Sequence, residues 1–366
     1  MPEENKQQKE IYIDELLAKA IKEKASDVHI SVGLPPIIRI TGKLKPLTEY
    51  QLLTEDTVKI ITAQLLSEEQ LDLLYKQKDI DLSYEVSTKE RFRVNIYFER
   101  GNLALAFRLI PLYIPTLNEL NLPNSLYNFC SVPQGLVLVT GPAGVGKSTT
   151  LASMMNWINQ NKNAHIVTIE DPIEYRLESN QALIHQRELH TDTNDWVRAL
   201  RSALREDINI LLVGETRDSE TMQLTLKAAE TGHLVFTTLH AYSATQAVER
   251  IISLFPESKQ EQARMQLSLV LNVIVTQTLV KGIDESKRYP ALEIMIATDA
   301  VRNTIREGNS HQLDNIINTG YELGMISMER SLAGLVNNGL VTVDEATFHA
   351  RKIDEFVRFL DKSKRR

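Results

Sequence analysis

The chain has 366 residues, of which 43% are hydrophobic and 24% are charged. This is ordinary globular composition, and at typical domain sizes the length leaves room for two domains. The formal net charge of -7 argues against a surface built to neutralise nucleic-acid phosphates, so we expect no nucleic-acid partner, and the single cysteine, Cys130, excludes an intramolecular disulfide framework and a four-cysteine zinc site.

The sequence shows no segment that would carry the chain into or across a membrane. Residues 1–10 are polar and charged and lack the apolar stretch of a secretory signal. The longest apolar stretch, 267–280, is too short to span a bilayer and is interrupted by Asn272, Thr276 and Gln277. We therefore expect a chain without a transmembrane segment, which contacts a membrane peripherally or through a partner.

The first 110 residues predict a small α+β domain. Apolar residues from Ile13 to Ile21 recur at helical spacing, which indicates a first helix. The segment from Ser67 to Gln70 has the spacing of a capping box, where a second helix would begin. Three alternating apolar runs follow and predict an antiparallel meander: 80–86, 92–98 and 103–109.

Four prolines between 111 and 133 predict a stiff connector over that range. Beyond it, short apolar runs without alternation indicate buried parallel strands joined by crossover helices, which places an α/β core at 134–298. The runs are 136–139, 166–169, 208–213 and 234–236. From 299 to 366 the pattern is helical, with four glycines as expected helix stops: Gly308, Gly320, Gly324 and Gly339.

A glycine-rich loop follows the first of these strands and precedes a helical stretch, which is the context of a Walker A motif. Its residues are Gly141, Pro142, Ala143, Gly144, Val145, Gly146, Lys147, Ser148 and Thr149. The glycines let backbone N–H groups close around a β-phosphate, and the helix N-terminus adds positive potential. Lys147 would neutralise the β- and γ-phosphates and Ser148 would ligate Mg²⁺, so we expect ATP and Mg²⁺ as cofactors.

Hydrolysis also needs a carboxylate that positions the attacking water, and two strand ends offer one. One apolar strand ends in Gly214 and Glu215, and another ends in Glu170, with Glu174 close behind. Because Gly214 occupies the position of an ordinary Walker B aspartate, metal coordination would pass through water or through Glu170. The sequence leaves open which of the three glutamates matters most.

One histidine is a candidate for the same site. His240 follows the apolar run 234–236, at the strand edge where ligands gather in parallel sheets. Its imidazole would there sense the γ-phosphate. A lone histidine beside a buried strand is more often a hydrogen-bonded core residue, so both interpretations stay open at this point.

These residues resemble a known family, the secretion ATPases of type II secretion and type IV pili. The resemblance covers almost the whole chain and rests on four motifs: 141–149 (GPAGVGKST), 168–174 (TIEDPIE, like the family's Asp box), 204–218 (LREDINILLVGETRD, like its Walker B) and 230–240 (ETGHLVFTTLH, like its His box). Residues 26–42 and 91–95 are similar to the family's PAS-like domain. The resemblance implies a PAS-like α+β domain at 1–110, a RecA-like P-loop core at 134–298, and a helical C-terminal part of the ATPase domain at 299–366.

Within the family, the retraction-type members are the most similar. The assembly and secretion members typically carry a tetracysteine metal module that a single cysteine cannot form. The segment 300–307 (AVRNTIRE) resembles the AIRNLIRE motif associated with retraction, with Val301 and Thr304 departing from the usual Ile and Leu. The motif residues that we carry forward are Arg302, Asn303, Arg306 and Glu307.

The resemblance also implies an assembly and a place of action. It implies a homo-hexameric motor in the cytoplasm, peripheral at the inner face of the bacterial inner membrane, which powers pilus retraction and twitching motility. Its partners would be the inner-membrane pilus platform protein and, indirectly, the pilin filament. Arginines of a neighbouring subunit would reach the γ-phosphate, with Arg93 and Arg108 as candidates and Arg91 and Arg100 in reserve.

Two other functions remain open. RecA-like folds also drive nucleic-acid motors, although the acidic charge and the 6% aromatic content count against this function. The chain could instead be a nucleotide-gated scaffold that binds ATP without turnover. Glu215 discriminates between a scaffold and an enzyme, because a pure binder has no use for a carboxylate that positions water.

Overall fold

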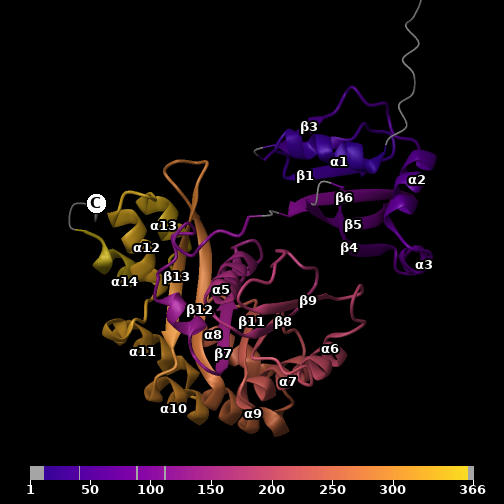
Figure 1. Ribbon diagram of the computed structural model, residues 1–366. Helices are drawn as coiled ribbons and strands as arrows, with labels where there is room; N and C mark the ends of the chain where they lie inside the picture. The colour runs from indigo at the N-terminus through magenta and orange to yellow at the C-terminus, as the bar shows by residue number, and fades with distance from the viewer. Residues whose placement is uncertain (1–11, 41, 88–89, 111–112, 362–366) are drawn as a thin grey trace, which may run out of the picture. The chain divides into compact units, whose positions relative to one another are not determined.

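The structure is a computed structural model, and it describes residues 12–40, 42–87, 90–110 and 113–361 (Figure 1). The chain divides into two units. One comprises Met1–Tyr113 and Pro172–Tyr175, and the other comprises Ile114–Asp171 and Arg176–Arg366. Each unit has its own β-sheet and its own hydrophobic core, as expected of two domains.

The N-terminal unit is built on a six-stranded antiparallel sheet in the order β3-β2-β1-β6-β5-β4. Its elements are α1 (Ile13–Lys22), β1 (Asp27–Ser31), β2 (Ile37–Ile40), β3 (Lys43–Pro46), α2 (Glu55–Leu65), α3 (Glu68–Gln77), β4 (Asp79–Glu85), β5 (Arg91–Glu99) and β6 (Asn102–Ile110). Side chains along β5 alternate between core and surface, with Phe92, Val94 and Ile96 buried. Helix α1 packs on β1 and helix α2 on β6.

Several predictions for this unit are confirmed. Helix α1 buries one apolar face, and the three alternating runs form β4, β5 and β6. Helix α3 begins at the predicted capping box, in which the side chains of Ser67 and Gln70 each accept the other residue's backbone N–H. Strands β1 to β3 and helix α2 have no counterpart among the predictions. Strand β3, for example, is exposed at all four positions and therefore carries no alternating pattern.

The second unit is built on a seven-stranded sheet in the order β13-β12-β7-β11-β10-β8-β9. Neighbouring strands from β12 to β9 are parallel, and the edge strand β13 is antiparallel to β12. The strands are β7 (Gly135–Thr140), β8 (His165–Glu170), β9 (Leu183–Glu188), β10 (Ile210–Val213), β11 (Leu234–Leu239), β12 (Leu271–Lys281) and β13 (Arg288–Ile296). The predicted α/β class and the four predicted parallel strands are confirmed.

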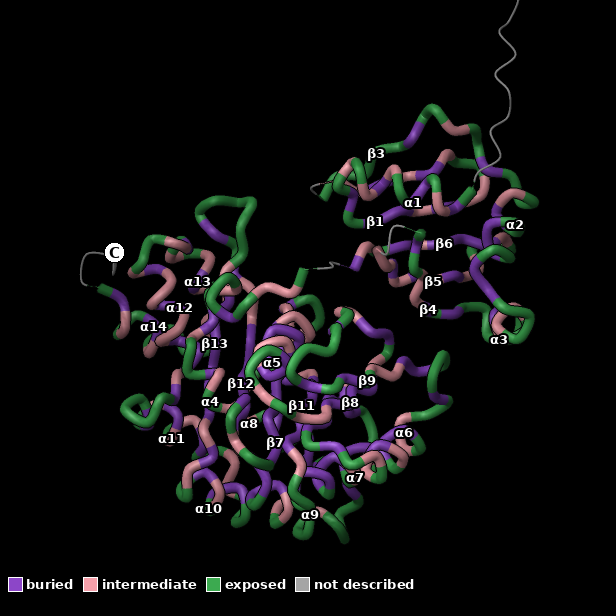
Figure 2. The backbone as a smooth tube through the Cα atoms, in the orientation of Figure 1, coloured by how far each residue is buried: buried purple, intermediate pink, exposed green. Residues whose placement is uncertain are grey.

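Helices cover both faces of this sheet (Figure 1). Successive residues of β7 point to opposite faces, so Leu136 and Leu138 belong to one core and Val137 and Val139 to the other. The central strands are therefore buried along their length (Figure 2). The covering helices are α4 (Leu126–Cys130), α5 (Lys147–Asn161), α6 (Trp196–Ala203), α7 (Ser219–Glu230), α8 (Ala244–Ser253) and α9 (Glu257–Val270).

Of the predicted connector 111–133, residues 111 and 112 lie outside the described residues, and residues 114–133 group with the second unit. Leu117, Leu122 and Leu126 are buried in the same core as helix α5. Helix α4 ends at Cys130, whose complete burial raises the pKa of its thiol to about 12. The apolar side chains of this segment are buried, but the prolines interrupt their periodicity. A search for helical or strand periodicity therefore does not detect this packing.

The chain after β13 is helical, as predicted. Its helices are α10 (Asp299–Glu307), η1 (Ser310–Gln312), α11 (Leu313–Thr319), η2 (Tyr321–Leu323), α12 (Met328–Asn337), α13 (Val343–His349) and α14 (Ile353–Phe359). Gly308 is the C-cap of α10 and Gly324 is the C-cap of η2, both with the positive φ that glycine tolerates. Helices α12 to α14 enclose a small core of their own with Val280 of β12 and Ala291 of β13.

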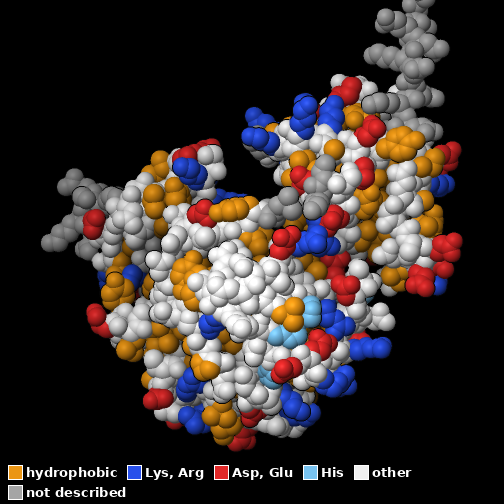
Figure 3. Space-filling view, in the orientation of Figure 1, with side chains coloured by type: hydrophobic (Ala, Val, Ile, Leu, Met, Phe, Trp, Pro, Cys, Tyr) orange, Lys and Arg blue, Asp and Glu red, His pale blue; other side chains and the backbone are white. Residues whose placement is uncertain are grey.

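The apolar stretch 267–280 forms the end of α9 and most of β12. Its composition reflects the position of β12 inside the sheet, between β7 and β13. Among the residues that the structure describes, no helix combines the length and the apolar character needed to cross a bilayer. On the face shown in Figure 3, Lys and Arg side chains are interspersed with Asp and Glu.

The capping box of α3 gives a first test of this fold. Ser67→Ala removes the acceptor for the Gln70 N–H, so we expect the N-terminal unit to lose about 1 kcal/mol of stability. Hydrogen exchange of the α3 amides measures this loss directly. Ser67→Asp keeps an acceptor at the cap and should lose much less. Equal protection in the wild type and the alanine variant would contradict the assigned cap.

Candidate active site

The predicted phosphate-binding loop connects β7 to α5 at the carboxyl edge of the parallel strands. Gly141, Gly144 and Gly146 have φ angles of 145°, 77° and 89°, which residues with side chains disfavour. A Cβ atom at Gly141 would lie 2.3 Å from the backbone oxygen of Gln277 on β12. The chain can make this turn only because these positions carry no side chain.

The N-terminus of α5 differs from those of the neighbouring helices. Asp195, Asp218 and Ser243 cap α6, α7 and α8 with side-chain oxygens that accept a backbone N–H. The N-cap of α5 is Gly146, and no acidic residue lies in its first turn. Helix α5 therefore directs the positive end of its dipole at the loop with no capping carboxylate, which fits a phosphate ligand.

Lys147, Ser148 and Thr149 form the first turn of α5. The ammonium group of Lys147 donates hydrogen bonds to the backbone oxygens of Gly141 and Pro142, both at 2.9 Å, so this side chain lies back over its own loop. All three first-turn residues are partly exposed. A cation and two hydroxyl groups thus stand at the loop, which is the set that a triphosphate with Mg²⁺ requires.

Two strand ends bring further polar groups beside the loop. Strand β11 lies between β7 and β10, so the residues that follow β10 and β11 emerge next to the loop. Oε1 of Glu215 is 3.2 Å from Nε2 of His240, and its Oε2 accepts a 2.8 Å hydrogen bond from Arg217. The His240 side chain is 39% exposed. It is therefore a surface group beside Glu215 and does not fit the alternative of a core histidine.

The electrostatics of His240 indicate an electropositive site. Burial lowers the pKa of His240 below its ordinary value, and three nearby cations lower it further: Lys147, Arg217 and Arg250. The carboxylate of Glu215 acts in the opposite direction. Cations that oppose protonation of an imidazole favour a bound polyphosphate for the same reason.

Gly214, which the sequence places at the position of a Walker B aspartate, has little room for a side chain. A Cβ atom at Gly214 would lie 3.3 Å from the Cα of Glu170 and 3.3 Å from the backbone oxygen of Ile169. The Glu170 carboxylate accepts hydrogen bonds from Thr168 at 2.7 Å and from Gln186 at 3.3 Å. Glu170 is thus held beside Gly214 at the end of β8.

Other predicted site residues lie in the N-terminal unit. Glu174 is part of Pro172–Tyr175, which groups with that unit, and its role stays a prediction. Arg93 and Arg108 are paired opposite each other on β5 and β6. Arg93 is 3.8 Å from Asp81, Arg108 is 3.0 Å from Asp27, and their side chains are 41% and 74% exposed. Both can therefore reach a group outside their own sheet, and their role stays a prediction.

The reserve arginines are placed differently. Arg91 donates a 2.6 Å hydrogen bond to Ser83 of the adjacent strand β4. Arg100 lies at the turn between β5 and β6, 3.8 Å from Glu99, and its side chain is 90% exposed. Neither shares the opposed pairing of Arg93 and Arg108.

The segment that resembles the retraction motif forms most of α10. Arg302 donates hydrogen bonds to the backbone oxygens of Ser268 and Leu269, at 2.6 and 2.8 Å, and so caps the C-terminal end of α9. Burial lowers the pKa of the Arg302 guanidinium. The other motif residues are exposed: Asn303, Arg306 and Glu307. Arg306 donates a hydrogen bond to Asn303, and Asn309 donates one to Glu307. Arg302 is therefore the motif residue that bonds to another helix, and the other three are exposed to a partner.

Gln277 is a site residue that the sequence motifs do not reveal. It lies on β12 and is 4% exposed. Its Nε2 donates to the backbone oxygen of Val145 at 2.7 Å, and its Oε1 accepts from the hydroxyl of Thr150 at 2.8 Å. Gln277 thus ties the loop to the first turns of α5. The signal in the sequence is a glutamine within an otherwise apolar run, since a buried amide must find partners.

The glycine-rich loop, the parallel sheet and the strand-end carboxylate together define a P-loop nucleotide-binding protein. Residues 2–322 match the family described as "Type II/IV secretion system protein", and the chain belongs to this family. The family predicted from the four motifs is thereby confirmed.

Individual relatives agree with this assignment. The chain is 44% identical over 344 residues to the type IV pilus retractation ATPase PilT of Pseudomonas aeruginosa, covering 94% of this chain and 99% of that protein. It is 42% identical over 316 residues to a twitching motility protein of Neisseria gonorrhoeae, covering 86% and 84% of the two chains. A crystal structure of the pilus retraction motor PilT with bound ADP is similar with a TM-score of 0.88 and 40% identity, covering 95% of this chain and all of that one.

We call the two hydrogen bonds of Gln277, to Val145 and Thr150, the Gln277 clasp. The clasp can be tested without changing any group that would contact phosphate. Gln277→Leu leaves the Val145 oxygen and the Thr150 hydroxyl without their partner, at about 1–3 kcal/mol for each buried group. Since ~1.4 kcal/mol is a factor of ten, we expect ADP to bind about tenfold more weakly. Calorimetry on the folded variant measures the affinity. Thr278→Val, one position along β12, is the control, and an unchanged affinity in Gln277→Leu would refute the clasp.

Proposed function

We propose that the chain is an ATPase that powers type IV pilus retraction and twitching motility. Similarity to the Pseudomonas aeruginosa retraction ATPase over 94% of this chain carries the proposal. The site supports it independently, because a phosphate-binding loop lies beside a strand-end carboxylate and a histidine. The exposed residues of α10 offer the surface that the retraction motif implies: Asn303, Arg306 and Glu307.

The fold labels belong to the same proposal. The antiparallel sheet with helices α1 to α3 is the PAS-like domain of the family, over residues 1–110. The parallel sheet, with the loop strand β7 next to β11, is the RecA-like core over 134–298. Residues 299–366 complete the ATPase domain.

The catalytic groups have separate tasks. ATP binds with its phosphates against the loop, where the ammonium group of Lys147 leaves its backbone partners and pairs with the β- and γ-phosphates. Ser148, with water or Glu170, would hold Mg²⁺, which would supply further neutralisation of phosphate charge. Glu215 orients the attacking water, and Arg217 holds its second oxygen. His240, in contact with Glu215, responds to the γ-phosphate.

The proposed assembly is a homo-hexameric ring. Arg93 and Arg108 of one subunit reach the γ-phosphate bound by the next and stabilise the charge of the transition state. Hydrolysis then changes the position of one subunit's N-terminal domain relative to its neighbour. The ring acts in the cytoplasm at the inner face of the inner membrane, on the pilus platform protein and through it on the pilin filament.

The role of the phosphate-binding loop in ATP hydrolysis is tested with Lys147→Ala. Loss of the ammonium group removes charge stabilisation at the transferred phosphate, so we expect kcat/KM for ATP to fall roughly 100-fold or more. Release of inorganic phosphate by the purified protein measures this. Lys227→Ala, on the exposed face of α7, is the control. Undiminished turnover in Lys147→Ala would eliminate the proposed site.

Glu215→Gln separates an enzyme from a nucleotide-gated scaffold. The amide keeps the size of the side chain but orients water poorly, so kcat should fall about 100-fold while ATP still binds. A single-turnover assay with ATP, together with a binding measurement, provides both numbers. Glu220→Gln, a nearby exposed glutamate paired with Arg201, is the matched control. A wild-type protein that binds ATP without any turnover would favour the scaffold.

A further inference from the structure

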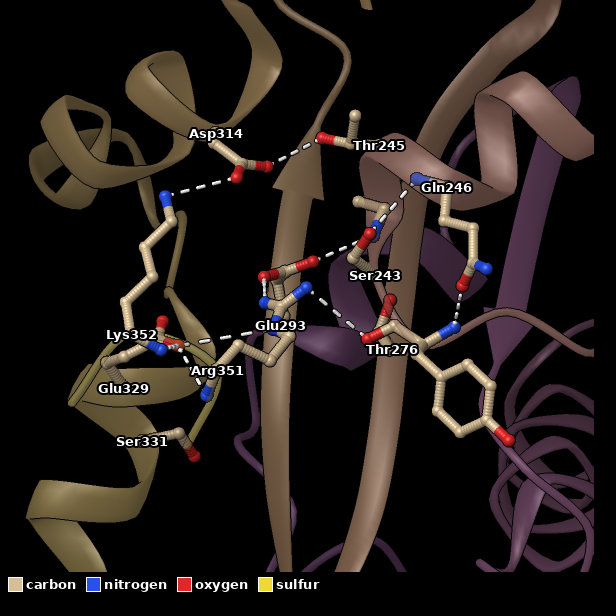
Figure 4. Close-up of polar contacts among 12 residues, drawn as sticks. Ser243, Thr245, Gln246, Thr276, Glu293, Asp314, Glu329, Ser331, Arg351 and Lys352 are labelled. Carbon is tan, nitrogen blue, oxygen red and sulfur yellow. Dashed lines mark hydrogen bonds and ion pairs between the residues drawn. The ribbon is translucent and has the colours of Figure 1, made fainter. Parts of the chain in front are cut away.

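A cluster of charged side chains lies away from the phosphate-binding loop, between β13 and the C-terminal helices (Figure 4). Glu293 of β13 and Glu329 of α12 have side chains that are only 3% exposed. Buried carboxylates need partners, because removal from water disfavours their charge. Burial accordingly raises the pKa of Glu293, and Arg351 opposes that change.

Arg351 and Lys352 supply the partners from the short segment between α13 and α14. The guanidinium of Arg351 forms an ion pair with Glu293 and lies 4.0 Å from Glu329. The backbone N–H groups of Arg351 and Lys352 both donate to Glu329, at 3.3 and 3.2 Å. Glu329 therefore fixes the backbone of this segment, and Glu293 fixes the direction of the Arg351 side chain.

The same cluster holds the loop that follows His240. Glu293 accepts the backbone N–H of Ala244 at 2.7 Å, and Arg351 donates to the backbone oxygen of Tyr242 at 3.3 Å. A second route starts from Lys352, whose ammonium is 3.1 Å from Asp314. Asp314 in turn accepts a 2.7 Å hydrogen bond from Thr245 of α8.

His240 lies two residues before the backbone oxygen that Arg351 contacts. The ladder between β11 and β7 ends with the pair Leu239 and Thr140, so His240 is the first residue beyond the sheet pairing. Two residues later the backbone is bound by Arg351. His240, whose imidazole contacts Glu215, thus lies between the end of β11 and the contact of Arg351 with Tyr242.

We propose that Arg351 is a positioning residue, through which the docked C-terminal helices hold the loop after His240 and thereby set the geometry of His240 against Glu215. Arg351 and Lys352 lie beyond the residues matched by the family's sequence model, 2–322. Undocking of the segment between α13 and α14 releases the loop and slows hydrolysis. The catalytic consequence rests on the proposed ATPase activity, whereas the effect on His240 does not.

The test is Arg351→Met in the full-length protein, which keeps much of the side-chain volume and removes the contact with Tyr242. Because displacement of reacting groups by about 1 Å can cost up to 100-fold, we expect kcat to fall on the order of tenfold. KM for ATP should change less than about twofold, since the loop and Lys147 are untouched. NMR titration of labelled histidine should show the pKa of His240 rising toward its ordinary value of about 6.5 as the loop loosens.

Arg330→Met is the matched control. Arg330 lies on α12 and stacks on the rings of Tyr321 and Phe359, so its described contacts stay within the C-terminal helices. It should lower the melting temperature without moving the pKa of His240. An Arg351→Met variant with wild-type kcat and an unchanged His240 pKa would overturn the proposal.

Arg351→Lys keeps the test decisive where the methionine variant does not fold. A lysine retains a cation for Glu293 but has no second nitrogen on a rigid plane to bond Tyr242 at the same time. We therefore expect stability to recover while kcat stays low. Recovery of both would mean that Arg351 has a structural role alone. Absence of turnover in the wild type would contradict the proposed function, and the His240 titration would still decide this inference.

Discussion

The candidate site depends first on the parallel pairing of β7, β11 and β10. Parallel strands end at one edge of a sheet. The pairs Val213–Thr237 and Leu239–Thr140 therefore place the carboxyl ends of β10, β11 and β7 next to one another. The glycine-rich loop follows β7, Glu215 follows β10 and His240 follows β11. Each of these groups lies within a few residues of a ladder hydrogen bond. The rigidity of the sheet is therefore passed to the groups that would act on phosphate.

The same edge also decides which residues have room for a side chain. Gly141 lies against the backbone of Gln277, and Gly214 lies against the backbone of Glu170. A carboxylate at position 214 would have to displace main chain. Glu215, one residue further along, extends past the sheet and meets His240 and Arg217 instead. Close packing between strands thus favours a glycine at position 214.

Local patterns in the sequence were sufficient for much of this arrangement. The loop, the strand-end glutamates and His240 are each recognisable from a few consecutive residues, because an apolar run followed by a polar group marks a strand end. Contacts across long separations in the chain are not recognisable in this way. Gln277 reaches Val145 only because β12 returns beside β7, and Arg302 caps α9 only because α10 folds back on it. Their partners are set by topology.

The N-terminal unit and the segment 114–133 show the other limit of sequence patterns. Strand β3 is exposed throughout, so the periodicity that reveals β4 to β6 is missing there. Between 114 and 133, apolar side chains are buried without any regular repeat, in a segment that contains Pro115, Pro123 and Pro133. Whether a side chain is buried in these regions depends on which distant segments of the chain pack against it. The charged cluster at Glu293 and Arg351 belongs to the same class, since its members are drawn from five separate segments.

The burial of Cys130 has a practical consequence for experiments on movement. Thiol-reactive dyes attack the thiolate, and a group that is shielded from solvent with a pKa of about 12 has almost none at neutral pH. A cysteine introduced on an exposed position would then react selectively, with the native thiol left in place. Pairs of fluorophores could be attached to the two units in this way, and their separation followed as nucleotide is added.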